Sequence, residues 1–561
     1  MVILGSPFLF NTESNEMKTT NFFAVLAVVS IATSEIRAQN DEAQIHGNVQ
    51  WDAQYYNEDS LIGAPVVPEA IRSSFRGDLT FNKGDFSAGM RFESYQKVLQ
   101  GFDSRFDGNA IMYRFAQYNK DGFDVTIGSF YEQFGSGIVL RTYYEPTLGY
   151  DSFLDGARIK YSPKPGIELK GVIGRQRFYM DYSPGTVRGL DGEIDLKSTV
   201  PFMTEWKTRV IVGASIVNKY QESNDLLTPG NVLAHAARLK ISRGNFLFNA
   251  EYAQKGQDPS FDNKKIYKYG NALLMNMSYF KKGLGAFIGI KRVDNMSFRS
   301  GRAMFGLDPM INFHPALTKQ HLYALANFYP YATQPNGEFA INGELGYRIK
   351  KKTLLGGKYG TKITVNASFV NAIQKDFIEG EVNSIGGQEY TSSWSLFSDS
   401  VYFRDYSVEI YKKFSKKFKA MALYTHQDYN MDVVQGLAGR GIIDQDIFVF
   451  EGTYKLTSRN ALIVQLQNLT TDKEEGSWGF GMVELTLAPN WFFAVVDQWN
   501  YGNEDPDKKI HYLLGSFGYS KNTTRVQFSY GRQRQGITCV GGVCRFVPAS
   551  NGLSFTLTSS F

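Results

Sequence analysis

The 561-residue chain lacks the long apolar runs that helical membrane proteins need. Its mean hydropathy is −0.28, and the apolar stretch at residues 22–33 is shorter than the roughly 20 residues of a membrane-spanning helix. Helical periodicity, which a soluble protein of this length normally displays, is also scarce. The net charge of +5 is too mild to indicate a nucleic-acid partner. These absences favour extended, sheet-forming segments.

Cysteine is nearly absent as well. Cys539 and Cys544 flank the sequence Val-Gly-Gly-Val, and a Gly-Gly pair can turn a hairpin that brings the two thiols together. In an oxidising compartment, this arrangement predicts a disulfide. A metal site needs more than two ligands, and no histidine lies nearby, so we expect neither a metal nor another cofactor.

Catalytic signatures are missing too. The chain contains no Gly-x-Ser-x-Gly, His-Glu-x-x-His or Walker sequence, and its six histidines are scattered. His426 and His511 stand in strand-like segments, which leaves a barrel-embedded lipid-modifying enzyme open as a third hypothesis. No carboxylate partner for either imidazole can be assigned from the sequence, so we expect that the protein is not an enzyme.

The chain is instead rich in aromatic residues and glycine, with 33 Tyr, 43 Phe and 54 Gly. In residues 553–561 apolar side chains occupy every second position except Ser559, and Phe561 ends the chain. Alternation with a period of two gives a strand one apolar face and one polar face. This ending resembles the closing strand of bacterial outer-membrane barrels, whose last residue is often Phe.

The same alternation recurs along the chain, for example in residues 75–81, 246–252, 339–349 and 362–369. Short turns and long connections alternate between these segments, which is the pattern of a transmembrane barrel. A soluble β-sandwich also alternates, but no second sheet system is available to bury its apolar faces. We therefore predict an all-β fold: a single large transmembrane antiparallel β-barrel of about 24 strands, within a range of roughly 18 to 26.

The N-terminal residues predict export. Met17-Lys18 precedes the apolar run 22–33, and a small residue, Ala38, stands where a signal peptidase would cut. We interpret residues 1–38 as an over-extended start followed by a Sec signal peptide, with translation beginning at Met17, and residues 39–561 as the barrel. The predicted location is the outer membrane of a Gram-negative cell, where the partners include membrane lipids and lipopolysaccharide.

One long connection, residues 294–337, departs from period two. Residues 318–329 fit a short helix, because Thr318 is a good N-cap, Pro330 ends the pattern, and one face would carry Leu317, His321, Leu325 and Phe328. Two positions for this helix remain open: folded into the lumen, or capping the outer mouth.

The polar face carries charges of both signs, which either line a solute path or brace the interior as cross-strand pairs. We predict that the following residues line the lumen, together with Glu168 and Lys170: Arg76, Asp78, Arg91, Glu93, Arg114, Asp124, Arg158, Lys160, Glu344 and Arg348.

Several tight turns are basic. In the predicted topology they lie on the periplasmic side, where they contact anionic lipid, cell-wall polymer or an acidic partner, or are simply solvated. Arg532 and Arg534 continue the outward face of their strand, near lipopolysaccharide phosphates. The basic turns contain Lys350, Lys351, Lys352, Lys412, Lys413, Lys416 and Lys417.

Four segments resemble a family of large, porin-like outer-membrane barrels of uncharacterised function: residues 134–143, 315–321, 329–335 and 356–362. The resemblance supplies no catalytic residues. Our leading hypothesis is a porin-like channel or uptake protein for a polar solute, with a partly occluded lumen. The alternative is a non-conducting scaffold or accessory subunit of an outer-membrane secretion or assembly complex, with a membrane protein as partner.

Overall fold

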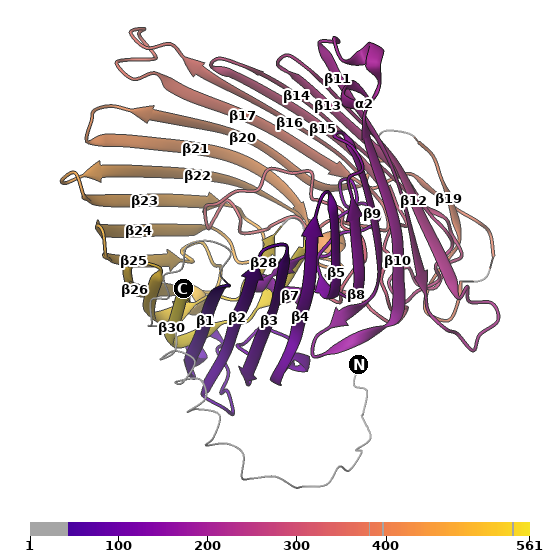
Figure 1. Ribbon diagram of the computed structural model, residues 1–561. Helices are drawn as coiled ribbons and strands as arrows, with labels where there is room; N and C mark the ends of the chain where they lie inside the picture. The colour runs from indigo at the N-terminus through magenta and orange to yellow at the C-terminus, as the bar shows by residue number, and fades with distance from the viewer. Residues whose placement is uncertain (1–42, 381, 395–397, 541–542) are drawn as a thin grey trace.

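A computed structural model describes residues 43–561 apart from 381, 395–397 and 541–542. The predicted over-extended start and signal peptide, together residues 1–38, lie outside the described residues. Twenty-four strands form one antiparallel sheet, and the last strand pairs with the first, so the sheet closes into a barrel (Figure 1). The predicted fold class and strand number are confirmed. Among the described residues, no helix has the length and apolar content needed to cross a membrane.

The first twelve barrel strands are β1 (Gln44–Asn57), β2 (Ile71–Lys83), β3 (Phe86–Gln96), β4 (Gly108–Lys120), β5 (Phe123–Phe130), β8 (Leu154–Tyr161), β9 (Ile167–Phe178), β10 (Asp181–Asp195), β11 (Thr208–Tyr220), β12 (Asn231–Arg243), β13 (Phe246–Lys255) and β14 (Gly270–Lys281). The other twelve are β15 (Leu284–Asp294), β16 (Glu338–Ile349), β17 (Thr361–Asn371), β20 (Val401–Lys413), β21 (Phe418–Asn430), β22 (Ile442–Lys455), β23 (Asn460–Thr470), β24 (Trp478–Leu487), β25 (Trp491–Trp499), β26 (His511–Lys521), β27 (Thr524–Gln533) and β30 (Ser550–Ser560).

Smaller elements lie in the connections. They are the strand pairs β6 (Tyr144–Glu145) with β7 (Tyr150–Asp151), β18 (Lys375–Phe377) with β19 (Tyr390–Ser392) and β28 (Gly536–Val540) with β29 (Val543–Val547); the α-helices α2 (Leu196–Thr199) and α3 (Met431–Val434); and the 3-10 turns η1 (Ser60–Ile62), η2 (Ser104–Phe106), η3 (Pro146–Leu148), η4 (Pro201–Met203) and η5 (Pro506–Lys508).

The two ends of the barrel differ in their connections. At one end most turns have two to five residues, with residues 196–207 and 350–360 as exceptions; we call this end the short-turn rim. At the other end, the long-connection rim, nearly all connections are longer, up to the 43 residues of 295–337. This asymmetry is the one expected of an outer-membrane barrel, with short turns on the periplasmic side.

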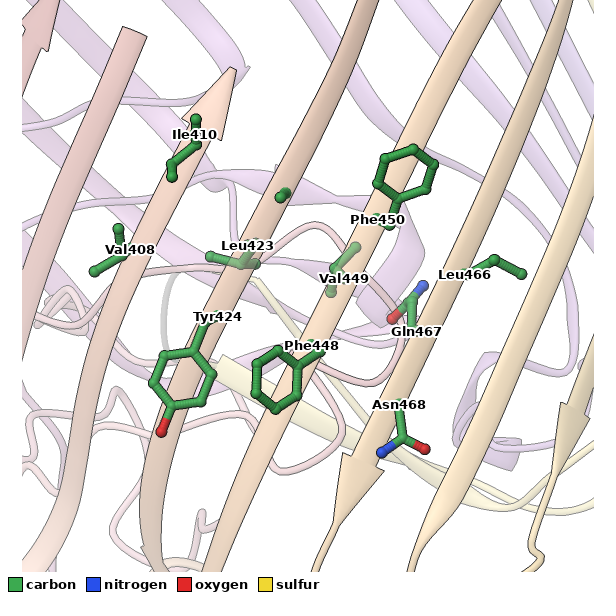
Figure 2. Close-up of a pocket in the computed structure, with 11 residues that line it drawn as sticks. Val408, Ile410, Leu423, Tyr424, Phe448, Val449, Phe450, Leu466, Gln467 and Asn468 are labelled. Atoms are coloured by element: carbon green, nitrogen blue, oxygen red, sulfur yellow. The ribbon is translucent and has the colours of Figure 1, made fainter. Parts of the chain in front are cut away.

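The outward face is apolar. Leu190 is 64% exposed and Leu466 is 55% exposed, as befits side chains without a protein neighbour on that side. Between β20 and β23 the outward side chains leave a shallow groove of about 470 Å³, and the side chains of Tyr424, Phe448 and Phe450 stand along it (Figure 2). A surface of this composition is suited to hydrocarbon.

The seam of the barrel is closed by backbone pairing of β1 with β30. The register places Trp51 opposite Leu557, and Gly47 and Phe561 exchange both backbone hydrogen bonds at 3.0 Å. A Cβ at Gly47 would lie 2.1 Å from the Phe561 ring, so a side chain there would displace the ring. The terminal aromatic ring therefore covers the one outward glycine at the seam.

Candidate functional site

Two of the connections that enter the barrel pack together against its inner wall. They are the β5–β8 connection, residues 131–153, and the β15–β16 connection, residues 295–337. Phe134 and Ile138 of the first and Phe298 and Ile311 of the second share one buried apolar cluster. The inward side chains of that cluster on β10 to β14 are small: Val187, Val217, Ala234, Ala236, Ala253 and Ala272. Small wall residues leave space that the two connections fill.

The β15–β16 connection then continues to the opposite wall. Leu325 and Phe328 pack with Leu423, Val449 and Trp478 on the inner faces of β21 to β24. The traces of such connections are visible inside the ring of strands in Figure 1. One chain segment therefore contacts inward side chains from β10 round to β24.

The prediction of a helix at residues 318–329 is wrong, because this segment contains no helix. The segment makes one turn, in which Asn327 N donates to Tyr323 O at 2.9 Å, and the short helices α2 and α3 lie in other connections. Side chains of the barrel wall form hydrogen bonds with backbone groups that a helix would pair internally. Gln467 accepts from Leu325 N at 2.8 Å, and Gln427 donates to Ala326 O at 3.1 Å.

Side-chain contacts explain the same departure from a helix. His321 forms a buried contact with Asp405 at 2.7 Å, while Leu325 packs on the wall of β21 to β24. The residues expected on one helical face thus serve different parts of the wall. Tertiary contacts override the local helical pattern.

Half of the predicted lumen charges contact these connections directly. Arg91 lies 2.7 Å from Asp78 and 3.2 Å from Asp151 of the β5–β8 connection. Glu93, which is 0% exposed, is paired with Arg177 at 2.5 Å. Arg177 also reaches Asp151 at 2.8 Å. The charges therefore form a buried network between wall and connection.

A second network centres on Glu132, in the same connection. Its carboxylate lies 2.9 Å from Lys160, 3.5 Å from Lys170 and 3.9 Å from Arg158. Arg158 is also 3.3 Å from Asp124 on the neighbouring strand. One acidic loop residue thus anchors the connection to three wall cations.

The remaining predicted charges lie as follows. Arg76 is 3.6 Å from Asp52 and donates to the hydroxyl of Tyr144. Glu344 pairs with Lys319 of the β15–β16 connection. Arg348 and Glu168 are exposed near the short-turn rim, and Glu168 lies 2.9 Å from Lys170.

Arg114 does not line the lumen. It pairs in register with Met90, whose side chain is exposed on the outward face, and its guanidinium is 54% exposed, 3.3 Å from Asp155. The cause is a break in register between Arg91 and Glu93, which shifts the alternation of β4 by one residue.

Sequence reasoning missed the charges on β11 to β16 near the long-connection rim. Lys219 pairs with Asp258 at 2.6 Å, Lys255 donates to Ser297 O at 2.6 Å, and Lys291 pairs with Glu338. Extending the alternation to the strand ends would have found them.

Burial shifts the pKa of groups in the connections. Desolvation raises the pKa of Asp151, although Arg177 and Arg91 oppose the shift. Burial also raises the pKa of Tyr331 well above its usual value, and the neighbouring Glu338 adds to this shift. Burial and the nearby Lys291 lower the pKa of His314 to about 3. Burial in the connection therefore disfavours the charged forms of Asp151, Tyr331 and His314.

The described residues of the last connection, 534–540 and 543–549, also turn inward. The predicted disulfide between Cys539 and Cys544 is confirmed and joins β28 to β29. The predicted outward position of Arg534 is wrong, because its guanidinium lies 3.6 Å from the ring centroid of Phe328, in the β15–β16 connection. Burial lowers the pKa of Arg534 to about 10. Arg532 instead pairs with Asp59 at 2.6 Å.

The predicted basic turns are neighbours at the short-turn rim. β17 pairs with β20, which places Thr361 opposite Lys412, and Lys412 donates to Leu355 O at 3.2 Å. Lys413 lies over the ring of Tyr359 at 5.1 Å. The turns that contain Lys350, Lys351, Lys352, Lys416 and Lys417 therefore form one continuous basic surface.

The two strand histidines do have carboxylate partners. His426 lies 3.0 Å from Asp446, and His511 lies 2.7 Å from Asp497, on outward positions of their strands. In the described part of the chain, no serine donates to either imidazole, and no group of three or more His, Cys, Asp or Glu residues is placed to hold a metal.

The chain was compared with known proteins. The model of a family of unknown function, DUF6029, matches residues 17–561. A search of curated proteins gave no match. Among solved structures, the chain is similar to the P pilus usher (PapC) translocation pore at 8% identity, covering 92% of this chain and 99% of that one, with a TM-score of 0.39.

Two further solved structures come from Pseudomonas aeruginosa. The siderophore receptor PirA is 11% identical, covering 93% of this chain and 82% of that one, with a TM-score of 0.36. The outer membrane protein opdK is 10% identical, covering 92% and 98%, with a TM-score of 0.34.

Proposed function

Because the chain belongs to the DUF6029 family, whose function is unknown, we propose its role from its own geometry. We propose that it is a porin-like barrel of the Gram-negative outer membrane, exported by a Sec signal peptide, that passes or binds a polar solute. The β15–β16 connection narrows its lumen. The observation that carries this proposal is a closed sheet with an apolar outside, whose inward charges hold an internal chain segment.

The β15–β16 connection provides the test. Val293 of β15 pairs with Glu338 of β16, so a short turn can replace residues 298–334 without separating the strands. In planar bilayers we expect small or intermittent conductance from the natural chain and a larger, steady conductance from the shortened one. A shortened barrel that folds but conducts no more than the natural chain would contradict the proposal.

A second candidate, a scaffold or accessory subunit, is favoured by the basic surface at the short-turn rim. Residues 347–362, 411–419 and 454–461 contain no Asp or Glu. Leu354 is 97% exposed among these lysines, and Phe414 is 55% exposed. Exposed apolar side chains inside a cationic field suit an acidic protein partner better than simple solvation does.

The corresponding experiment compares two charge-neutralised variants in native membranes. One changes Lys350, Lys351, Lys352, Lys416 and Lys417 to Gln, and the control changes Lys83 and Lys120, which lie across the same rim. We expect an acidic protein that co-purifies with the natural chain and the control, but not with the first variant. The same set of proteins in all three preparations would exclude the scaffold function.

A further inference from the structure

A polar pocket lies inside the barrel, between the inward-turning 534–549 connection and the inner faces of β25 and β26. Its volume is about 290 Å³, near the lower limit of ligand pockets, which begin at roughly 300 Å³. Val496 and Leu514 supply apolar wall. The polar lining comes from Gln498 and Tyr512 on the wall, and from Arg532, Arg534, Gln535 and Thr538 on the other side.

Only one of the two arginines in this pocket has an ion pair. Arg532 pairs with Asp59 at 2.6 Å. Arg534 donates to Gln535 O at 2.9 Å; within the described residues no carboxylate makes an ion pair with its guanidinium, and Glu475 interacts with it only at longer range. Aromatic rings cover one side of that guanidinium, with Phe328 at 3.6 Å and Trp478 at 5.8 Å. One fixed, partly desolvated cation is therefore left facing the pocket.

A hydrogen-bond acceptor lies in the same pocket. The Oε1 atom of Gln498 is buried and has no partner among the described residues. A buried acceptor without a donor costs about 1–3 kcal/mol, so a ligand that supplies a donor gains from binding there. The pocket thus presents a cation and an unsatisfied acceptor.

We propose that this pocket is a binding site for a small carboxylate that also carries hydroxyl groups, such as a sugar acid. The carboxylate binds the Arg534 guanidinium, and a ligand hydroxyl donates to Gln498 Oε1. This inference rests on the proposed solute-binding function and names the class of solute. A guanidinium is suited to a carboxylate because two N–H groups match its two oxygens.

The site also links the solute to the β15–β16 connection. The guanidinium that binds the carboxylate is stacked on Phe328, which belongs to that connection and packs on the wall at Trp478. A bound anion compensates the charge of Arg534 where it contacts the connection. The solute therefore binds directly against the segment that narrows the lumen.

Titration calorimetry on the folded, full-length barrel in detergent tests the site. The probes are galacturonate, galactose, which lacks the carboxylate, and inorganic phosphate. We expect galacturonate to bind, galactose not to bind measurably, and Arg534→Gln to weaken galacturonate binding about tenfold or more, the loss of one charge-assisted hydrogen bond. Arg534→Lys keeps the charge and should restore part of the affinity.

Arg545→Gln is the matched control, because Arg545 lies in the same connection and over an aromatic ring, Phe102, but does not line the pocket. Equal binding of galactose and galacturonate, or tighter binding of phosphate, would overturn the carboxylate assignment. No binding by a barrel whose conductance responds to the shortened connection would overturn this inference and leave the proposed function standing. Binding without any conductance would support this inference and overturn the proposal that the barrel passes the solute.

Discussion

Arg177 shows how a single inward side chain holds the internal segments. Its guanidinium contacts both Glu93 and Asp151, and the side chains of all three are almost completely buried. A buried ion pair contributes little compared with an apolar replacement of both partners, but removing one partner leaves the other charge uncompensated. The loss of stability on removing Arg177 therefore depends on how well Glu93 and Asp151 remain paired without it.

Arg177→Ala is expected to destabilise the protein by about 3 kcal/mol, the low end for a broken buried pair, because Glu93 and Asp151 are left with Arg91 alone, at 3.9 and 3.2 Å. The measurement is the temperature at which the barrel loses its compact mobility in unheated SDS gels. Arg114→Ala is the control, since the exposed Arg114–Asp155 pair contributes less than about 1 kcal/mol. Equal shifts for the two variants would show that the buried network does not stabilise the barrel.

At the scale of elements, the β15–β16 connection responds to pH through His314. Burial, with Lys291 and Lys255 nearby, gives this imidazole a pKa of about 3, against 6.5 when it is free. The unfolded segment therefore binds a proton between these values while the packed segment does not. The packed state of the connection keeps its full stability above pH 6.5. Below that pH, it loses about 1.4 kcal/mol per pH unit relative to the unfolded segment as the pH falls toward 3.

Limited proteolysis follows this change, because a protease cuts the segment only when it leaves the wall. We expect cleavage within residues 295–337 to increase as the pH falls from 6.5 to 4, after correction for protease activity on an unfolded substrate. His314→Gln should remove most of that pH dependence. Cleavage that rises equally in both proteins would assign the effect to other groups.

The strands were predictable from the sequence, but the contacts of the connections were not. Alternation in residues such as 75–81 reports burial directly, because each side chain faces either lipid or interior. The position of Arg114 depends on a register break that leaves no mark in the alternation. The path of residues 318–329 is set by Gln467, Gln427 and Asp405, which are remote in sequence, so local pattern alone predicted a helix there.

At the scale of the whole molecule, closure depends on the pairing of β1 with β30, which are the first and last strands of the chain. Its paired residues, such as Asp52 and Thr556, are 504 positions apart in the sequence, so it is the least local pairing in the barrel. Its outward edge is completed by the Phe561 ring over Gly47. The aromatic residue at the end of the chain thus has a structural role at the seam.

Gly47→Val tests this closure. The new Cβ would lie 2.1 Å from the Phe561 ring, so the ring must move; because the contacted atoms are the tip of a 43% exposed ring, we expect the low end of overpacking costs, about 1 kcal/mol. We expect a lower unfolding temperature in SDS gels and a smaller fraction of closed barrel after refolding. Gly343→Val is the control, because a Cβ at Gly343 meets nothing within 4 Å. Phe561→Ala removes the ring without overpacking. If the Gly47→Val, Phe561→Ala double variant is as stable as Phe561→Ala alone, the cost of Gly47→Val comes from its contact with the ring. If the double variant is less stable, the cost arises elsewhere.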